Sequence, residues 1–433
     1  MKNTYFQTNK EENNNLPKDL IMRRILATFF CLTVIIPGVM AQEADPGWGI
    51  RFSGFVKTDF YYDTRQSSAS NGLREGHFYL FPDNVLYDLQ GNDINANPSF
   101  HILGIQTRIK GDISGPDAFG AKTSGVIEAE FFGTSDADIN GFRLRHAFVK
   151  MDWTGASLTM GQTWHPMFLA ESFPGTISFN TGAPFTPFSR NPQISLTGKV
   201  ESVSLSLTAY SQRDFTSPGP DGNSNKYLRN STLPGMNLQM RIPAGESFTA
   251  WTGIDYKRLR PELKSALNAE ANSVIGSFSV FANVKIKSDP INIMMMGVYA
   301  QNAADLMMTG GYAISGISGM YDENKTYTNL NTFSCWADLS TNGKRVTGGL
   351  FAGFSKNLGS GDPITGDVYG RGTNIDHLFR VSPRITVTEG RLSFAGEIER
   401  TAAAYGTRQN TGRVVDAERV CNMRILLSTI YRF

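Results

Sequence analysis

The sequence predicts an all-β protein, a transmembrane antiparallel β-barrel of about 16 strands, with 18 possible. Three observations predict this class. Segments of about ten residues alternate between apolar and polar positions. Short and long connections alternate between these segments, as they do in barrels that cross a membrane. The last segment ends on the final residue, Phe433, and an aromatic end is expected of a strand that pairs with the first strand to close a barrel.

The first strand, residues 50–63, shows the alternation most clearly. One face is apolar or small and ends in aromatic rings, as a lipid-facing strand should: Ile50, Phe52, Gly54, Val56, Thr58, Phe60 and Tyr62. The other face carries most of the polar and charged residues: Arg51, Ser53, Phe55, Lys57, Asp59, Tyr61 and Asp63.

Fifteen further segments repeat this pattern, which gives an even total. They are 100–113, 123–132, 142–153, 157–164, 193–200, 203–212, 236–243, 248–258, 273–287, 291–301, 327–339, 344–356, 376–388, 391–402 and 415–433. Residues 75–88 and 307–317 are weaker candidates that would raise the number. Sixteen strands leave an aqueous lumen, whereas eight are filled by side chains.

The connections between these segments differ in length in a regular way. Short turns at 153–156, 199–202, 287–290 and 388–391 alternate with long loops at 64–98, 164–192, 213–234, 302–325 and 357–374. Soluble β-sandwiches rarely carry five loops of such length. The asymmetry therefore favours a membrane barrel with long loops at one end.

The N-terminal region has the features of a targeting segment. Met22-Arg23-Arg24 precedes an uncharged apolar run at 25–39, and small residues lead to a cleavage position after Ala41. We expect a signal peptide over 22–41, because the run is too short for a spanning helix. Residues 1–21 are a possible misread upstream extension, with Met22 as the initiator, and the barrel is expected over 42–433.

Composition narrows the function classes. The first 41 residues hold five of the 41 basic and three of the 39 acidic residues, which leaves 36 of each in the expected mature chain. Binding of nucleic acid through bulk positive charge is therefore not expected. The 43 glycines and 29 phenylalanines suit many strands and turns.

Charged residues fall on the polar faces of the predicted strands and are expected to line the pore. The candidates for pore lining and constriction are Arg108, Lys110, Glu128, Glu130, Arg143, Arg145, Glu171, Arg241 and Arg384. A hairpin would bring Arg143 and Arg145 opposite Glu128 and Glu130. Two readings stay open: a transverse field that selects ions, and salt bridging that stiffens the wall.

The segment 164–192 is predicted to be a constriction loop. It carries little charge and five phenylalanines, at positions 168, 173, 179, 185 and 188. Folding into the barrel would bury these rings and place Glu171 across the opening from wall arginines. The alternative is that the rings form subunit contacts or cover a surface groove.

Two segments resemble a known family. Residues 141–165 (GFRLRHAFVKMDWTGASLTMGQTWH) and 49–65 (GIRFSGFVKTDFYYDTR), together with the C-terminus, are similar to DcaP-like porins of Gram-negative bacteria. The resemblance implies a sixteen-stranded outer-membrane barrel, usually a homotrimer, with an inward-folded loop. It also implies contact with outer-membrane lipid, and recognition of Phe433 by the barrel-assembly machinery.

The function expected from these observations is passive diffusion of small hydrophilic solutes through a charged aqueous pore. The alternative is a non-conducting barrel that acts as an adhesin or as a subunit of an envelope complex. The five histidines are widely separated, and neither an HExxH nor a GxSxG motif occurs. We therefore expect no enzymatic activity, no metal site and no cofactor.

Overall fold

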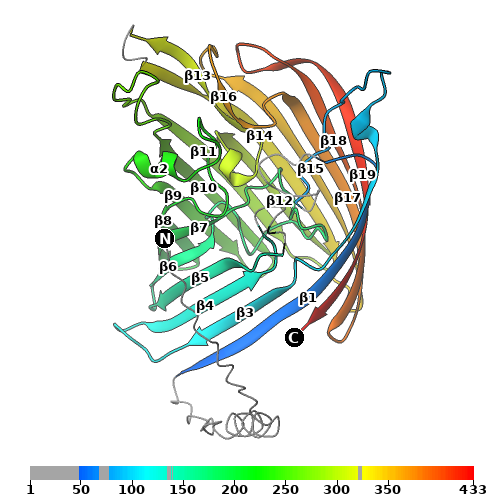
Figure 1. Cartoon of the computed structure of the whole chain (residues 1–433). Helices are drawn as coiled ribbons and strands as arrows, with labels where there is room; N and C mark the ends of the chain where they lie inside the picture. The colour runs from blue at the N-terminus through cyan, green and yellow to red at the C-terminus, as the bar shows by residue number, and fades with distance from the viewer. Residues whose placement is uncertain (1–47, 68–77, 134–137, 139, 320–323) are drawn as a thin grey trace, which may run out of the picture. The chain divides into compact units, whose positions relative to one another are not determined.

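The computed structural model describes residues 48–67, 78–133, 138, 140–319 and 324–433. The predicted upstream extension (1–21) and signal peptide (22–41) lie outside the described residues. Residues 49–433 form one unit, a closed antiparallel β-barrel (Figure 1). The fold class expected from the alternation is therefore confirmed.

Strands make up most of the described chain. Their bounds are β1 (Gly49–Asp63), β2 (Ser99–Leu103), β3 (Arg108–Ser114), β4 (Lys122–Glu130), β5 (Arg143–Asp152), β6 (Ala156–Trp164), β7 (Arg190–Val200), β8 (Val203–Tyr210), β9 (Gly235–Ala244), β10 (Phe248–Leu259), β11 (Ile275–Ile286), β12 (Ile291–Gln301), β13 (Gly310–Ser318), β14 (Asn324–Thr341), β15 (Val346–Ser360), β16 (Val368–Arg371), β17 (Ile375–Glu389), β18 (Leu392–Arg408) and β19 (Val414–Arg432). The described helical segments are η1 (Ile94–Ala96), α2 (Lys226–Asn230) and η3 (Ala304–Leu306).

The barrel has 16 strand positions. Strands β2 and β3 follow one another along β1 and share one position. Strand β12 pairs directly with β14, and β15 pairs directly with β17, so β13 and β16 lie outside the circuit. The weaker candidate 307–317 does contain β13, but this strand pairs with β14 beyond the end of β12 and extends the sheet without adding a position. Residues 78–88 of the other weak candidate form only isolated bridges.

The last strand closes the barrel against the first. Strands β1 and β19 pair from Phe55 opposite Arg432 to Asp63 opposite Arg424. The main chains of Gly54 and Phe433 exchange two hydrogen bonds, of 3.2 and 3.1 Å. The prediction that the last strand pairs with the first to close the barrel is therefore confirmed.

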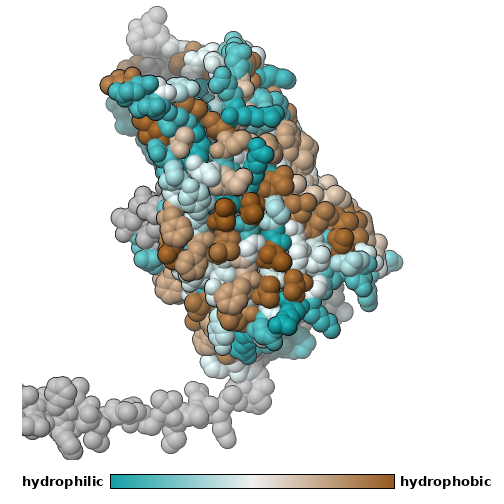
Figure 2. All heavy atoms as spheres, turned by 90° about the vertical axis from the view of Figure 1, so that its right-hand side faces the viewer, coloured by the Kyte–Doolittle hydropathy of each residue, from teal (hydrophilic) through white to brown (hydrophobic). Residues whose placement is uncertain are grey.

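The outer face is apolar and the inner face is polar, as the period of two requires. On β1, Phe52 is 63% exposed on the outside, whereas Lys57 is 4% exposed on the inside. On β19, Leu427 is exposed and its neighbour Leu426 is buried. Figure 2 shows hydrophobic side chains across the middle of one face and hydrophilic side chains toward both ends. An apolar middle band is what contact with acyl chains demands.

Connection lengths differ between the two ends of the barrel. The turns at 153–155, 201–202, 245–247, 287–290, 342–345 and 390–391 lie at the end where β1 begins and β19 ends (Figure 1). Longer connections at the other end include 64–98, 165–189 and 211–234. No helix among the described residues is long and apolar enough to cross a membrane.

Candidate pore and constriction

The constriction loop is the segment 165–189 between β6 and β7, and it crosses the interior of the barrel. Its backbone N–H groups at Ile177 and Ser178 donate to the carboxylate of Glu397 on β18, at 2.7 and 3.2 Å. The Asn180 amide donates to Glu399 at 2.7 Å. Both acceptors face inward on the strand. The loop therefore reaches the wall that lies far from its own strands in the sequence.

Two more wall residues hold the later part of the loop. Arg380 donates from Nη1 to the carbonyl oxygen of Ala183 at 2.8 Å, and Ser334 donates from Oγ to the carbonyl oxygen of Phe185 at 3.0 Å. Arg380 and Ser334 have no exposed surface. These bonds satisfy loop carbonyl groups that would otherwise be buried without a partner. The predicted inward fold of this segment is confirmed.

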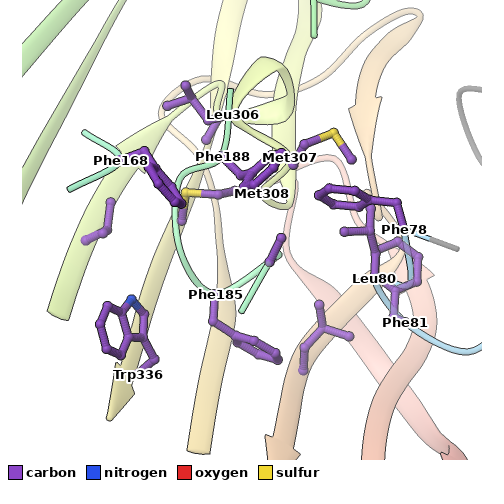
Figure 3. Packing of buried hydrophobic residues seen from close by; sticks show 14 of the residues in the cluster. Phe78, Leu80, Phe81, Phe168, Phe185, Phe188, Leu306, Met307, Met308 and Trp336 are labelled. Carbon is purple, nitrogen blue, oxygen red and sulfur yellow. The ribbon is translucent and has the colours of Figure 1, made fainter. Parts of the chain in front are cut away.

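An apolar cluster inside the barrel explains why this loop is rich in phenylalanine. Three connections contribute, and Figure 3 shows Phe78, Leu80 and Phe81 from the first, Phe168, Phe185 and Phe188 from the second, and Leu306, Met307 and Met308 from the third, with Trp336 from the wall. The rings of Phe78 and Phe188 are 5.0 Å apart, and the N–H of Phe188 donates to Leu306 at 2.8 Å. Burial of the rings within the lumen removes apolar area from water and stabilises the loop.

The start of the loop is fixed by His165. Its Nδ1 accepts a hydrogen bond from the N–H of Met167 at 3.2 Å, and its Nε2 lies 3.7 Å from the Asp255 carboxylate. Burial lowers the pKa of His165 to about 3, so the imidazole is neutral at neutral pH. Asp255 also accepts hydrogen bonds from Tyr210 and Asn237, at 2.7 and 3.1 Å. A neutral, hydrogen-bonded histidine is thus the first residue of the loop after β6.

A dense ion-pair network lies on the inner wall of β3–β5. Arg145 contacts Glu128 at 2.6 Å and Glu130 at 2.5 Å. Glu130 also pairs with Arg143 at 2.8 Å and with Arg108 at 3.2 Å. The predicted juxtaposition of two arginines and two glutamates across a hairpin therefore exists. Glu130 has no exposed surface and Arg145 is 2% exposed, so both are buried within the wall.

Two residues that the sequence did not single out complete this network. Arg190, where the chain re-enters the wall, pairs with Asp214 at 2.7 Å and lies 3.4 Å from Glu130. Asp214 also contacts Arg143 at 3.2 Å. Both Arg190 and Asp214 are adjacent to predicted strands, but nothing in the local pattern indicates that they meet. Buried charges of this kind persist only when they are paired.

A β-bulge explains how the wall presents two polar side chains in succession. Opposite β4, His146 pairs with Glu128 and Leu144 pairs with Ala129, which leaves Arg145 as the extra residue. Arg145 and His146 are both buried on the inner side, and the His146 Nδ1 lies 3.1 Å from the Thr163 hydroxyl. Strict alternation would have placed His146 outside.

The remaining predicted pore residues lie elsewhere on the wall. Glu171 pairs with Arg241 at 2.9 Å, and the Lys285 ammonium donates to the Glu171 carbonyl. The side chains of Glu171 and Arg241 are 60% and 34% exposed, so this pair borders open space. Glu171 thus faces a wall arginine, as expected, and the wall at this point is formed by β9–β11. Lys110 pairs with its strand neighbour Asp112 at 2.7 Å.

The structure places Arg384 in a pair that the sequence did not indicate. It binds the carboxylate of Asp338 with two contacts of 2.8 Å. Asp338 lies on β14, two strand positions away from β17. The predicted pore residues therefore form four groups: the network on β3–β5, the Lys110 pair, the Glu171 pair and the Arg384 pair.

Two cavities flank the constriction loop. One holds about 340 Å³ and is lined on its wall side by Gln106, Arg108, Glu128, Arg145 and His146. The other holds about 240 Å³ and is lined mainly by hydroxyl and amide groups of β6–β9, such as Thr159, Gln193, Ser195, Thr208 and Gln239. Trp164, Phe168 and Ala170 line both. Polar space thus lies on either side of one aromatic partition.

Comparison with known proteins supports this architecture. The chain matches no protein-family model and no curated protein. Among solved structures it resembles the outer membrane channel DcaP of Acinetobacter baumannii, with a TM-score of 0.66 at 16% identity over 90% of this chain and 99% of that one. It also resembles an anion-selective porin from Comamonas acidovorans, with a TM-score of 0.54 at 10% identity over 89% of this chain and 100% of that one.

A third similar structure is the outer-membrane protein OmpT of Vibrio cholerae, with a TM-score of 0.53 at 8% identity over 89% of this chain and 98% of that one. At these sequence identities the likeness shows a shared fold and does not indicate which solutes are transported. The resemblance to DcaP-like porins drawn from two sequence segments and the C-terminus is thereby confirmed at the level of fold. The chain has the closed sixteen-position barrel of the outer-membrane porins and channels.

Proposed function

We propose that this protein is a porin of the Gram-negative outer membrane through which small hydrophilic solutes diffuse passively. The observation that carries the proposal is the pair of cavities, each lined in part by polar side chains, on either side of a loop that folds into a closed barrel. Interior loops of this kind narrow a wide barrel to the width of a solute, and wall charges then set selectivity. The proposal involves no bond chemistry and no cofactor.

The wall charges support two different tasks. The network on β3–β5 is mutually paired and mostly buried, which favours stiffening of the wall over an open field. The pair of Glu171 and Arg241 is partly exposed, so its charges can act on passing ions. We infer that selectivity resides mainly at the second pair.

The surroundings of the protein follow from the same proposal. The apolar outer band suits outer-membrane lipid. The resemblance to DcaP-like porins favours a homotrimer, and the terminal Phe433 favours recognition by the barrel-assembly machinery. Cross-linking of purified protein in mild detergent tests the trimer directly, because a barrel without a specific interface would remain a monomer.

A non-conducting barrel is the competing function. The size of the apolar cluster favours it, because three connections fill part of the lumen with tightly packed side chains. Such a barrel would serve as an adhesin or as a subunit of an envelope complex.

Planar-bilayer recording separates the two functions. A porin gives discrete conductance steps in KCl, and liposomes that contain it swell in solutes of low molecular mass. A correctly folded barrel that produces neither steps nor swelling would refute the porin proposal.

A further inference from the structure

We propose that the cavity of about 340 Å³ beside the constriction loop binds solutes that combine an aromatic ring with a carboxylate, for which benzoate is the simplest probe. This inference rests on the proposed function and specifies a class of solute for it. The cavity, called the ring cavity below, has one aromatic side and one cationic side. Its aromatic lining includes Trp164, Phe168, Phe173, Phe179 and Phe188, and its polar lining includes Gln106, Arg108, Glu128, Arg145 and His146.

The aromatic side offers ring faces in a stack. The ring of Phe168 stacks on Trp164 with centroids 4.0 Å apart, and Phe173 stacks on Phe168 at 5.4 Å. Phe173 is 40% exposed at the end of this stack, so it is open to a further ring. Hydrophilic solutes gain little from such a surface, whereas an aromatic solute gains both apolar burial and stacking.

The cationic side offers a guanidinium that is still accessible. The Arg108 side chain is 21% exposed, compared with 2% for Arg145 and none for Arg190. Its guanidinium already lies 3.5 Å from Glu128 at Nε and 3.2 Å from Glu130 at Nη2, so a solute meets only its exposed part. Of the two arginines that line the ring cavity, Arg108 is therefore the one that a solute carboxylate can reach.

Gln106 supplies a second donor beside Arg108. Its Oε1 already accepts a hydrogen bond from the buried Lys57 ammonium. The amide N–H₂ of Gln106 is therefore the end of this side chain available to a solute. An amide donor and a guanidinium that line the same cavity can serve the two oxygens of one carboxylate.

The charge balance of the wall favours an anion. The network contains four guanidinium groups, on Arg108, Arg143, Arg145 and Arg190, and three carboxylates, on Glu128, Glu130 and Asp214. A bound carboxylate would balance the remaining positive charge. A bound organic cation would increase it.

The volume limits the solute to a small one. Ligand sites commonly occupy about 300–1,000 Å³, and the ring cavity lies near the lower end of this range. It accommodates a single ring with its carboxylate. An oligosaccharide or a peptide of several residues would extend beyond it.

Blocking of ionic current tests the proposal in its simplest form. The purified full-length protein in a planar bilayer conducts KCl while benzoate, acetate or benzylammonium is added. Benzoate is expected to lower the conductance at concentrations at which acetate, which lacks the ring, and benzylammonium, which lacks the anion, have no effect. Equal effects of benzoate and acetate would overturn the proposal.

Two variants with matched controls test the two sides of the cavity. Phe173→Ala is expected to raise the half-blocking benzoate concentration about three- to tenfold, and Arg108→Gln about tenfold or more. Phe142→Ala and Arg51→Gln serve as controls, since Phe142 is 63% exposed and the Arg51 side chain is 85% exposed, and neither lines the cavity. The controls should leave the blocking concentration unchanged, and equal shifts in controls and test variants would refute the assignment.

Calorimetry in detergent separates this inference from the porin proposal. A barrel that does not conduct but binds benzoate, with weaker binding in Arg108→Gln, would refute the porin function and retain the site. A barrel that conducts KCl but shows neither block nor binding by benzoate would retain the porin function and refute the site.

Discussion

Arg384 and Asp338 form a two-contact ion pair inside the barrel, with both Nη atoms of the arginine 2.8 Å from carboxylate oxygens. Asp338 has no exposed surface, and the same carboxylate accepts the N–H of Gly175 in the constriction loop at 3.3 Å. One carboxylate therefore joins β14, β17 and the loop. In the strand order, β18, β19 and β1 separate this pair from the network of β3–β5.

Loss of Asp338 is expected to destabilise the barrel strongly. Asp338→Ala leaves the buried Arg384 guanidinium unpaired, which costs about 3–5 kcal/mol of unfolding free energy. Urea unfolding of the refolded protein in lipid vesicles, followed by tryptophan fluorescence, measures this. The control is Arg345→Gln, which breaks an ion pair at the surface. The side chains of Arg345 and its partner Glu389 are 75% and 78% exposed, so water can replace the lost contact. If both variants unfold at the same urea concentration, the pair is not a structural anchor.

Removal of the Glu397 carboxylate is expected to release the middle of the constriction loop. Glu397→Ala deletes the acceptor on β18 for two loop N–H groups, at Ile177 and Ser178, so the loop should also sample positions nearer its own strands, β6 and β7. Single-channel recordings should then show higher and noisier conductance than the wild type. Glu418→Ala, at an exposed position of β19, is the control and should conduct as the wild type does. Unchanged conductance in Glu397→Ala would mean that the loop does not limit the pore.

The charge of Glu171 is expected to reduce anion selectivity. In Glu171→Gln the positive charges of Arg241 and Lys285 are no longer offset, and the chloride-to-potassium permeability ratio should rise about two- to fivefold. Reversal potentials in a KCl gradient report this ratio, and the difference should shrink in high salt because the pair is exposed. Glu246→Gln, in an exposed turn, is the matched control. A ratio that stays constant would remove Glu171 from the selectivity site.

Gly161 is expected to tolerate no side chain. Its φ is +131°, and an added Cβ would lie 2.2 Å from the carbonyl oxygen of Ala147. Gly161→Ala should cost about 1–3 kcal/mol from backbone conformation alone, with the clash adding to it. Gly198→Ala on β7 is the control, since no atom lies within 4 Å of its added Cβ. Urea midpoints that coincide for the two variants would contradict this account.

The Phe433 side chain is expected to matter for assembly in cells more than for the final fold. Phe433→Ala keeps both main-chain hydrogen bonds to Gly54, so refolding into detergent should match the wild type. If the assembly machinery recognises the Phe433 ring, the amount of folded, heat-modifiable barrel in the outer membrane should be several-fold lower for Phe433→Ala than for the wild type. Phe394→Ala, at an exposed position of β18, controls for loss of one outer aromatic ring. Equal membrane levels of the two variants would argue against recognition of the terminal ring.

The barrel could be predicted from the sequence because its signal is local. Alternation on a strand such as β1 fixes which side chains face lipid without knowledge of any partner. The loop of 165–189 was also predictable, since five rings with little charge need burial. Glu128, Glu130, Arg143 and Arg145 were brought together correctly because one hairpin joins their strands.

The rest depends on contacts between distant parts of the chain. Asp338 and Arg384 are separated by 46 positions, and Lys57 and Ile177 by 120, so no local pattern pairs them. The bulge at Arg145 changes the facing of the following residues, and strict alternation cannot anticipate it. The apolar cluster was foreseen only from the constriction loop, because the contributions of Phe78 and Met308 depend on where two other connections meet.

The shared packing of these three connections has an evolutionary consequence. Shortening the segment around Phe78, Phe188 or Leu306 would uncover apolar surface on the other two, so insertions and deletions at the three places should co-occur among homologues. Grafting one connection alone onto another barrel should therefore yield a poorly ordered chimera, whereas exchanging all three together should preserve a well-packed interior.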